Sequence, residues 1–289
     1  MLVHEWNDHE LVRRIGLHHR QNRSYALLFH DTHHRAVTDK AKMSEYDLSN
    51  YDGVLAFGGV IRDLYLSEGW AKRALTLHEA ADTRTFSPLQ RDSDSPTYDI
   101  VWIGNWGDEE RTAELHEFLI EPACELGLRV LVHGVRYPKS ALAEVERHGI
   151  DFVEWLPNFA VPQAFAQRTL TVHVPRRPYT ESLPGIPTIR PFEALACGIP
   201  LISAFWEDKE KLFTPGKDFL FVRDGNEMKS AMEHLHLLED GSLRRNLIEH
   251  GLRTIHSRHT CAHRVDELMG IYEDLKAQER TTGKRAAAV

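Results

Sequence analysis

The sequence predicts an α/β protein built from two Rossmann-like domains, each organised around a parallel sheet. Short apolar runs of strand length alternate with stretches of helical periodicity along the chain. The alternation stops at the polar segment 78–97, which contains two prolines and three aspartates, and then resumes at Tyr98. Such a composition is typical of a linker. We therefore expect a partial N-terminal domain at 1–90, a second domain at 97–275 and a frayed tail at 276–289.

The elements of the first domain follow from this alternation. Strands are expected at 1–4, 25–29, 51–57 and 73–77, and helices at 11–18 and 61–68.

The second domain begins with the apolar run YDIVWI at Tyr98, which predicts its first strand. Further strands are expected at 129–132, 152–155, 169–174, 200–203 and 219–222. A helix is expected with Leu115, Phe118, Leu119 and Leu126 on one face, and further helices at 139–148, 162–167, 192–196 and 227–238. Two closing helices are expected at 243–255 and 260–275.

Composition narrows the class of protein. The 289 residues are 42% hydrophobic and 27% charged, with a formal net charge of −8, which favours a soluble globular protein and disfavours nucleic acid as a partner. Three widely spaced cysteines are typical of a reduced, cytoplasmic location. No run approaches the ~20 apolar residues that span a bilayer, so we expect at most peripheral membrane contact.

The most informative segment runs from 172 to 203. A strand ends at Val174, a loop rich in proline and arginine follows, and a helix is expected to begin at Pro191 and to stop at Gly198. Free amides and the helix dipole at such an N-terminus favour an anion, for which a diphosphate is suited. Glu193, expected in the first helical turn, could accept hydrogen bonds from a ribose diol or simply complement the helix dipole.

The run RPFEALACGIPLIS resembles the donor-site helix of the group 1 glycosyltransferases, and the longer run from Leu183 to Leu220 is most similar to their CgeB-type branch. The similarity extends from about Tyr98 to Tyr272, and more weakly over the first 90 residues. It implies a GT-B-like fold, in which two Rossmann-like domains face a cleft. It also implies metal-independent sugar transfer from a nucleotide-diphosphate donor, a substrate rather than a cofactor, to an unknown glycan, lipid or protein acceptor.

The resemblance assigns roles to residues of this segment. Glu193 would hold the nucleotide ribose, and the preceding loop and helix start would face the diphosphate. The donor-binding candidates in that loop and helix start are Gly185, Thr188, Arg190, Pro191 and Phe192. Many group 1 members carry a second glutamate where this chain has Gly185, and Glu181 lies outside the motif spacing, so the family's retaining mechanism does not transfer directly.

Two further turns of the second domain resemble the family. IGNWGDEER is similar to the first donor-domain loop, with Gly104, Asn105 and Arg111 as matches, although an ordinary turn with a surface arginine would look the same. EWLPN matches the loop where the nucleobase sits, but Trp155 within it is of a type more often found in a core.

In the first domain, ALLFHDTHHRAV resembles the strand end that places a histidine against the donor sugar. His30 is that match, with Asp31 beside it, and we expect this pair to be catalytic. A solvated loop histidine is the alternative for His30.

Rival functions have weaker support. His30, Asp31, His33 and His34 could form a metal centre, as could His256, His259 and His263, but close histidines without a located further ligand are weak evidence, and we expect no metal site.

Motifs of serine hydrolases, P-loop NTPases and dinucleotide-binding proteins are absent from the sequence. A non-catalytic nucleotide-sugar-binding module or partner subunit stays open, since about three βα units of an acceptor domain would precede LVHEW in the family. The oligomeric state is likewise open.

Overall fold

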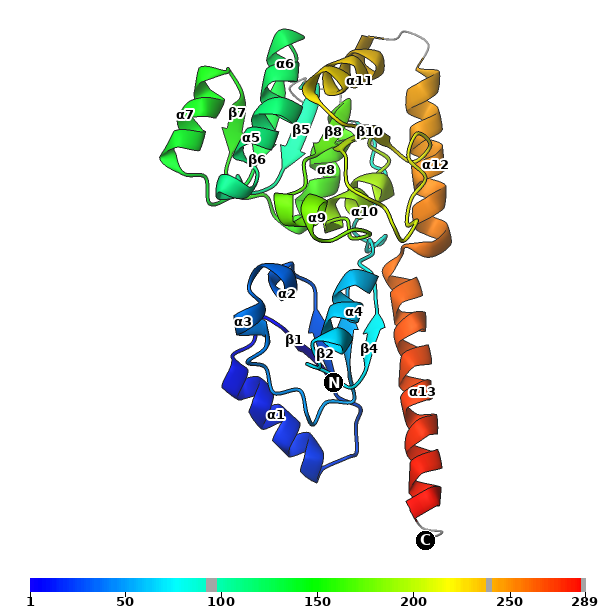
Figure 1. The fold of residues 1–289 in the computed structure, drawn as a ribbon. Coiled ribbons are helices and arrows are strands. Elements are labelled where there is room, and N and C mark those ends of the chain that lie inside the picture. Colours follow the sequence, from blue (N-terminus) through cyan, green and yellow to red (C-terminus); the bar gives the residue numbers. More distant parts are fainter. Residues whose placement is uncertain (92–97, 238–240, 287–289) are drawn as a thin grey trace. The chain divides into compact units, whose positions relative to one another are not determined.

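The computed structural model describes residues 1–91, 98–237 and 241–286, and it divides into two compact units (Figure 1). The first unit comprises Met1–Glu79, Ser182–Ile186 and Ala262–Val289, and the second comprises Ala80–Glu181 and Pro187–Cys261. Each unit contains one parallel sheet, so the predicted α/β architecture with two parallel-sheet domains is confirmed.

The sheet of the first unit has four parallel strands in the order β1-β2-β3-β4. Its strands are β1 (Leu2–His4), β2 (Leu28–Asp31), β3 (Gly53–Ala56) and β4 (Ala74–Thr76). Its N-terminal helices are α1 (His9–Gln21), α2 (Arg35–Thr38), α3 (Lys40–Met43) and α4 (Gly59–Ser67). His4 pairs in register with His30, so the carboxyl ends of the first two strands lie side by side.

The long helix α13 (Cys261–Ala286) also packs in the first unit. Leu268, Ile271 and Leu275 form an apolar stripe that contacts Leu28 and Leu55 on the sheet. This corrects the prediction that the second domain extends to residue 275, since a stripe at helical spacing does not reveal which sheet it will cover. The helix also continues to Ala286 into the segment expected to fray, while 287–289 lie outside the described residues.

The second sheet has six parallel strands in the order β10-β9-β8-β5-β6-β7. Its strands are β5 (Ile100–Ile103), β6 (Val130–His133), β7 (Asp151–Val153), β8 (Leu170–His173), β9 (Leu201–Ala204) and β10 (Leu220–Val222). The chain moves outward from β5 through β6 and β7, then returns to β8 on the other side. The boundary between β5 and β8 is therefore a topological switch point.

Helices cover both faces of this sheet, as alternate residues of β5 show. Ile100 and Trp102 belong to one apolar core, and Val101 belongs to the other. The first core includes α5 (Thr112–Leu115), η2 (His116–Ile120), α6 (Glu121–Glu125), α7 (Lys139–Arg147) and α11 (Gly225–Leu237). The second includes α8 (Val161–Ala166), α10 (Ile189–Ala196) and α12 (Ser242–Arg258).

Short elements were not predicted because single turns carry too little periodicity. Besides α2 and α3, these are η1 (Asp108–Glu110), η3 (Asn158–Ala160) and α9 (Arg177–Glu181).

The expected linker at 78–97 is partly structured. Ala81 forms an isolated parallel bridge with Thr260, and Phe86 is buried in the second core of the second unit. The boundary between the two units falls at Glu79 and Ala80, at the start of the predicted segment, and the residues after it belong to the second unit. Residues 92–97 of the predicted linker lie outside the described residues.

Candidate functional site

The switch point between β5 and β8 is where an open parallel sheet binds ligands, outside the carboxyl ends of its strands. The loop after β5 begins at Gly104, and β8 ends at His173. Arg111 joins the two strand ends, because its Nη1 donates to the Val174 carbonyl oxygen at 3.0 Å and its Nη2 donates to that of Asn105.

Arg111 is half-buried and lies near other cations. Its guanidinium lies 5.1 Å from the Trp102 ring centroid. Burial, together with the nearby charges of Arg176 and Arg190, lowers the pKa of Arg111 to about 10. The group stays protonated at neutral pH. The predicted Arg111 is therefore the centre of a positive cluster rather than a surface arginine.

Gly107, rather than the predicted Gly104, is the position in this loop that requires a glycine. The Gly104 amide donates to the His133 carbonyl oxygen at 2.9 Å, so it is not free for a phosphate. Gly107 has a φ of 85°, and a Cβ there would lie 3.1 Å from Arg111 side-chain atoms. Gly107 allows the arginine to fold against the loop, a role that the sequence analysis missed.

Asn105 stabilises the same loop. Besides accepting from Arg111, its side-chain Oδ1 accepts from the Val135 amide at 3.3 Å. The predicted Asn105 therefore holds the loop through both its backbone and its side chain.

Helix α10 begins at Ile189, two residues earlier than expected. Pro191 is consequently the third helical residue rather than the first, where its missing N–H still removes no helical hydrogen bond. Thr188 is the N-cap, but its hydroxyl bonds to His173 rather than capping the helix. The amides of Ile189 and Arg190 are thus left without a side-chain cap.

Glu193 lies in the second turn of α10, not in the first as expected, and is only 5% exposed. Its Oε2 accepts a 2.5 Å hydrogen bond from Arg190 Nη1. Burial raises the pKa of Glu193, and the Arg190 charge opposes that rise. Oε1 receives no hydrogen bond from any group within the described ranges, so it is an available acceptor.

Phe192 does not fit its predicted donor-binding role. Its ring is fully buried in the core, 5.1 Å from the Phe213 ring centroid and 5.3 Å from that of His259. The side chain follows the apolar face of a short amphipathic helix and packs in the second core of the second unit.

His173, which was not predicted to be a site residue, is buried at the end of β8 next to the start of α10. The Ser203 hydroxyl donates to the Ala204 carbonyl oxygen, so it accepts from His173 Nδ1–H at 2.9 Å, which leaves Nε2 to accept from Thr188 at 2.9 Å. Burial lowers the pKa of His173 to about 3, helped by the nearby Arg111 and Arg190 charges. A neutral histidine therefore fixes the start of α10. The sequence feature that could have indicated His173 is a histidine at the end of an apolar strand.

Gly185 belongs to the first unit, whereas Thr188 and the residues of α10 belong to the second. Its φ of 94° is a left-handed conformation in which any side chain would be strained.

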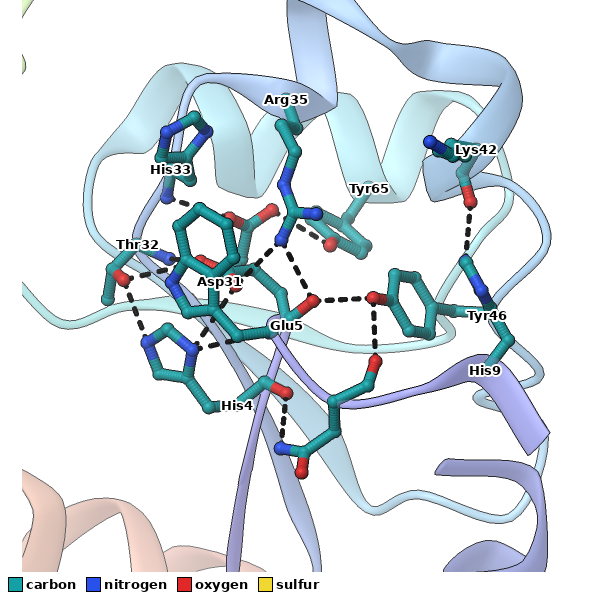
Figure 2. A network of polar contacts seen from close by, with 12 residues as sticks. His4, Glu5, His9, Asp31, Thr32, His33, Arg35, Lys42, Tyr46 and Tyr65 are labelled. Carbon is teal, nitrogen blue, oxygen red and sulfur yellow. Dashed lines mark hydrogen bonds and ion pairs between the residues drawn. The ribbon is translucent and has the colours of Figure 1, made fainter. Parts of the chain in front are cut away.

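The predicted catalytic pair, His30 and Asp31, lies at the carboxyl end of β2 in the first unit. Figure 2 shows Asp31 with its partners Tyr65 and His33. Burial and the neighbouring His4 lower the pKa of His30 to about 4, so the imidazole is neutral at pH 7. Asp31 is fully buried, and its carboxylate accepts from the Tyr65 hydroxyl at 2.9 Å and the His33 amide at 3.1 Å. Burial raises the pKa of Asp31 to about 6. Both carboxylate oxygens of Asp31 thus accept hydrogen bonds from within the first unit, and its catalytic role stays a prediction.

Neither histidine-rich segment forms a metal centre in the described part of the chain, where no group of three or more suitable ligands was found. His34 Nδ1 bonds to Thr38 Oγ1 at 2.9 Å. His259 is buried and bonds to the Leu212 carbonyl oxygen, whereas His256 is exposed.

Trp155, expected in a core, is 69% exposed. It follows the edge strand β7, which leaves its side chain with few neighbours to pack against. Considering only the described helices, none has the length and apolar content required to cross a bilayer.

Comparison with known proteins follows from this geometry. A family model described as glycosyl transferase-like matches residues 111–270, more than half of the chain. The chain belongs to the glycosyl transferase-like family. The match includes Arg111 and all of α10. No match to a curated protein was found.

Solved structures with the GT-B fold resemble the whole chain. Sucrose-phosphate synthase from Thermosynechococcus elongatus has a TM-score of 0.68 at 17% identity, covering 96% of this chain and 74% of its own. A Rickettsia africae glycosyltransferase has a TM-score of 0.68 at 9% identity, covering 94% and 83%. Anabaena HepE in complex with UDP-glucose has a TM-score of 0.65 at 14% identity, covering 97% and 78%. The predicted GT-B-like fold is confirmed.

Proposed function

We propose that this family member transfers a sugar from a nucleotide-diphosphate donor to an acceptor hydroxyl, and that it represents the CgeB-type branch. The observation that carries the proposal is the convergence of Arg111, Arg190 and Glu193 at the switch point of the second sheet. Two cations, uncapped amides and a buried carboxylate match the parts of a nucleoside diphosphate.

In this proposal the diphosphate lies against the first amides of α10. The amides of Ile189 and Arg190 donate to its oxygens, and the helix dipole and the Arg111 charge add to the attraction. Glu193 Oε1 accepts from a ribose hydroxyl, while Oε2 stays bound to Arg190. His173 acts through Thr188 by holding the helix start in place.

The same groups would stabilise the reaction. As the glycosidic bond breaks, negative charge develops on the leaving diphosphate, and preoriented amides and guanidinium groups stabilise it without requiring a divalent cation. The neutral His30 imidazole would hydrogen-bond a hydroxyl of the transferred sugar, with Asp31 positioning the strand end.

A thermal-shift screen against uridine, guanosine and adenosine diphosphates and their sugar conjugates tests donor binding. UDP comes first, because the Anabaena HepE structures are complexes with UDP or UDP-glucose. Release of nucleotide diphosphate is then followed with and without EDTA. Turnover that resists EDTA supports the proposal. Binding without turnover on any acceptor supports a non-catalytic module instead, and no binding to any nucleotide contradicts both.

A further inference from the structure

Trp6 is a large aromatic side chain at the surface of the first unit. It follows the carboxyl end of β1 and is 62% exposed. One face of its indole is covered by Arg35, whose Cζ lies 4.1 Å from the ring centroid. An exposed aromatic residue packed from one side by a cation presents a flat surface on its other side.

Arg35, Glu5 and Tyr46 hold this surface in place, and Figure 2 shows the contacts among them. Arg35 Nη2 donates to the Glu5 carbonyl oxygen at 2.9 Å and to Glu5 Oε2 at 3.0 Å. Glu5 is 0% exposed, and the Tyr46 hydroxyl donates to its carbonyl oxygen at 2.5 Å. Because Arg35 is fixed at two points of a buried residue, the indole above it is preorganised.

The border of this surface is polar. The His33 ring meets the indole edge-on at a centroid distance of 4.9 Å, and the His4 ring lies 6.5 Å away in a nearly parallel plane. Asn7 follows directly, with its side-chain amide donating to the His4 carbonyl oxygen. A lipid tail would require a contiguous apolar area, whereas a ligand with a flat apolar face and a ring of hydroxyl groups fits an aromatic plate with a polar border.

We propose that Trp6 is the stacking platform of a carbohydrate subsite and that the acceptor is a glycan. A pyranose ring lies on the indole, where its weakly positive axial C–H groups meet the negative face of the ring system. Asn7, whose side-chain nitrogen is bound to the His4 carbonyl oxygen, accepts a hydrogen bond from an equatorial hydroxyl through its Oδ1. This inference rests on the proposed transferase function and specifies its acceptor class.

The test uses the full chain and short oligosaccharides of glucose, N-acetylglucosamine and glucuronic acid. Binding is measured without donor by saturation-transfer NMR and titration. Trp6→Leu keeps an apolar contact with Arg35 but removes the aromatic face, and we expect it to weaken oligosaccharide binding about tenfold. Trp6→Phe retains a ring and should restore most of the affinity. Leu66→Ala, an exposed apolar position on α4, is the matched control.

The outcomes separate this inference from the proposed function. All three variants should bind UDP like the unmodified chain, because donor binding resides in the second unit. Oligosaccharide binding that is equal in Trp6→Leu and the unmodified chain overturns the platform, as does a panel in which no oligosaccharide binds. If the unmodified chain binds no nucleotide, the proposed function is contradicted. The oligosaccharide measurements, made without donor, would still test the platform on their own.

Discussion

Arg190 and Glu193 form an ion pair within α10, with Nη1 of the arginine 2.5 Å from Oε2 of the glutamate. The pair joins the cation proposed for the diphosphate to the carboxylate proposed for the ribose. Each group orients the other, because both are largely withdrawn from solvent. A change at either residue should therefore alter both parts of nucleotide recognition.

Glu193→Gln should weaken UDP binding roughly tenfold, as expected when a hydrogen bond to a charged group loses its charge. The amide preserves the shape of the side chain, so the fold should be retained. Isothermal titration with UDP measures the effect. Glu249→Gln, an exposed carboxylate on α12 of the same unit, is the control. Equal affinity in Glu193→Gln and the unmodified chain would remove Glu193 from the donor site.

Arg111→Lys should lower the free energy of unfolding by about 1–3 kcal/mol, because an ammonium group cannot bond the Val174 and Asn105 carbonyl oxygens with the same planar geometry. UDP affinity should fall as well, since the loop and its charge shift together. Urea unfolding and titration measure the two effects. Arg253→Lys on the exposed face of α12 serves as the control. A fully stable Arg111→Lys would show that the two strand ends do not depend on this residue.

His173 should make the second unit sensitive to acid. Its pKa is lowered to about 3 in the folded state, so the unfolded chain binds a proton that the folded chain excludes between pH 6.5 and 3. The stability that depends on neutral His173 is thus complete above pH 6.5 and decreases as the pH falls through that window.

The free energy of unfolding should fall less between pH 7 and pH 5 in His173→Asn than in the unmodified chain, by up to about 2 kcal/mol. The variant should be less stable at pH 7, since Ser203 and Thr188 each lose a hydrogen-bond partner. Urea midpoints at several pH values measure this, with the exposed His256→Asn as control. Parallel pH profiles for His173→Asn and the unmodified chain would refute the assignment of this proton to His173.

Phe192→Leu tests whether the Phe192 side chain contributes to donor binding. A smaller side chain in the second core should reduce the free energy of unfolding by about 1–2 kcal/mol. UDP affinity should stay within about twofold, because the ring faces the core rather than a ligand. A large loss of affinity with little loss of stability would return Phe192 to the donor-binding group.

Local pattern was sufficient to predict the strands and the longer helices. The apolar runs of β5, β6, β8 and β9 are buried on both sides, so their composition shows in the sequence without knowledge of their partners. The segment around Glu193 was identifiable for a similar reason, because a loop, a helix start and a carboxylate follow one another within a few residues.

Contacts between distant residues decided the rest. His173 contacts Ser203 because β8 and β9 pair in register, and Thr188 bonds to the same histidine. The apolar stripe at Leu268 and Leu275 packs against strand residues more than 200 positions earlier in the chain. The spacing of residues along a chain specifies which faces are apolar and where turns occur. Which faces meet depends on burial and hydrogen bonding summed over the whole fold, and so only the tertiary structure reveals it.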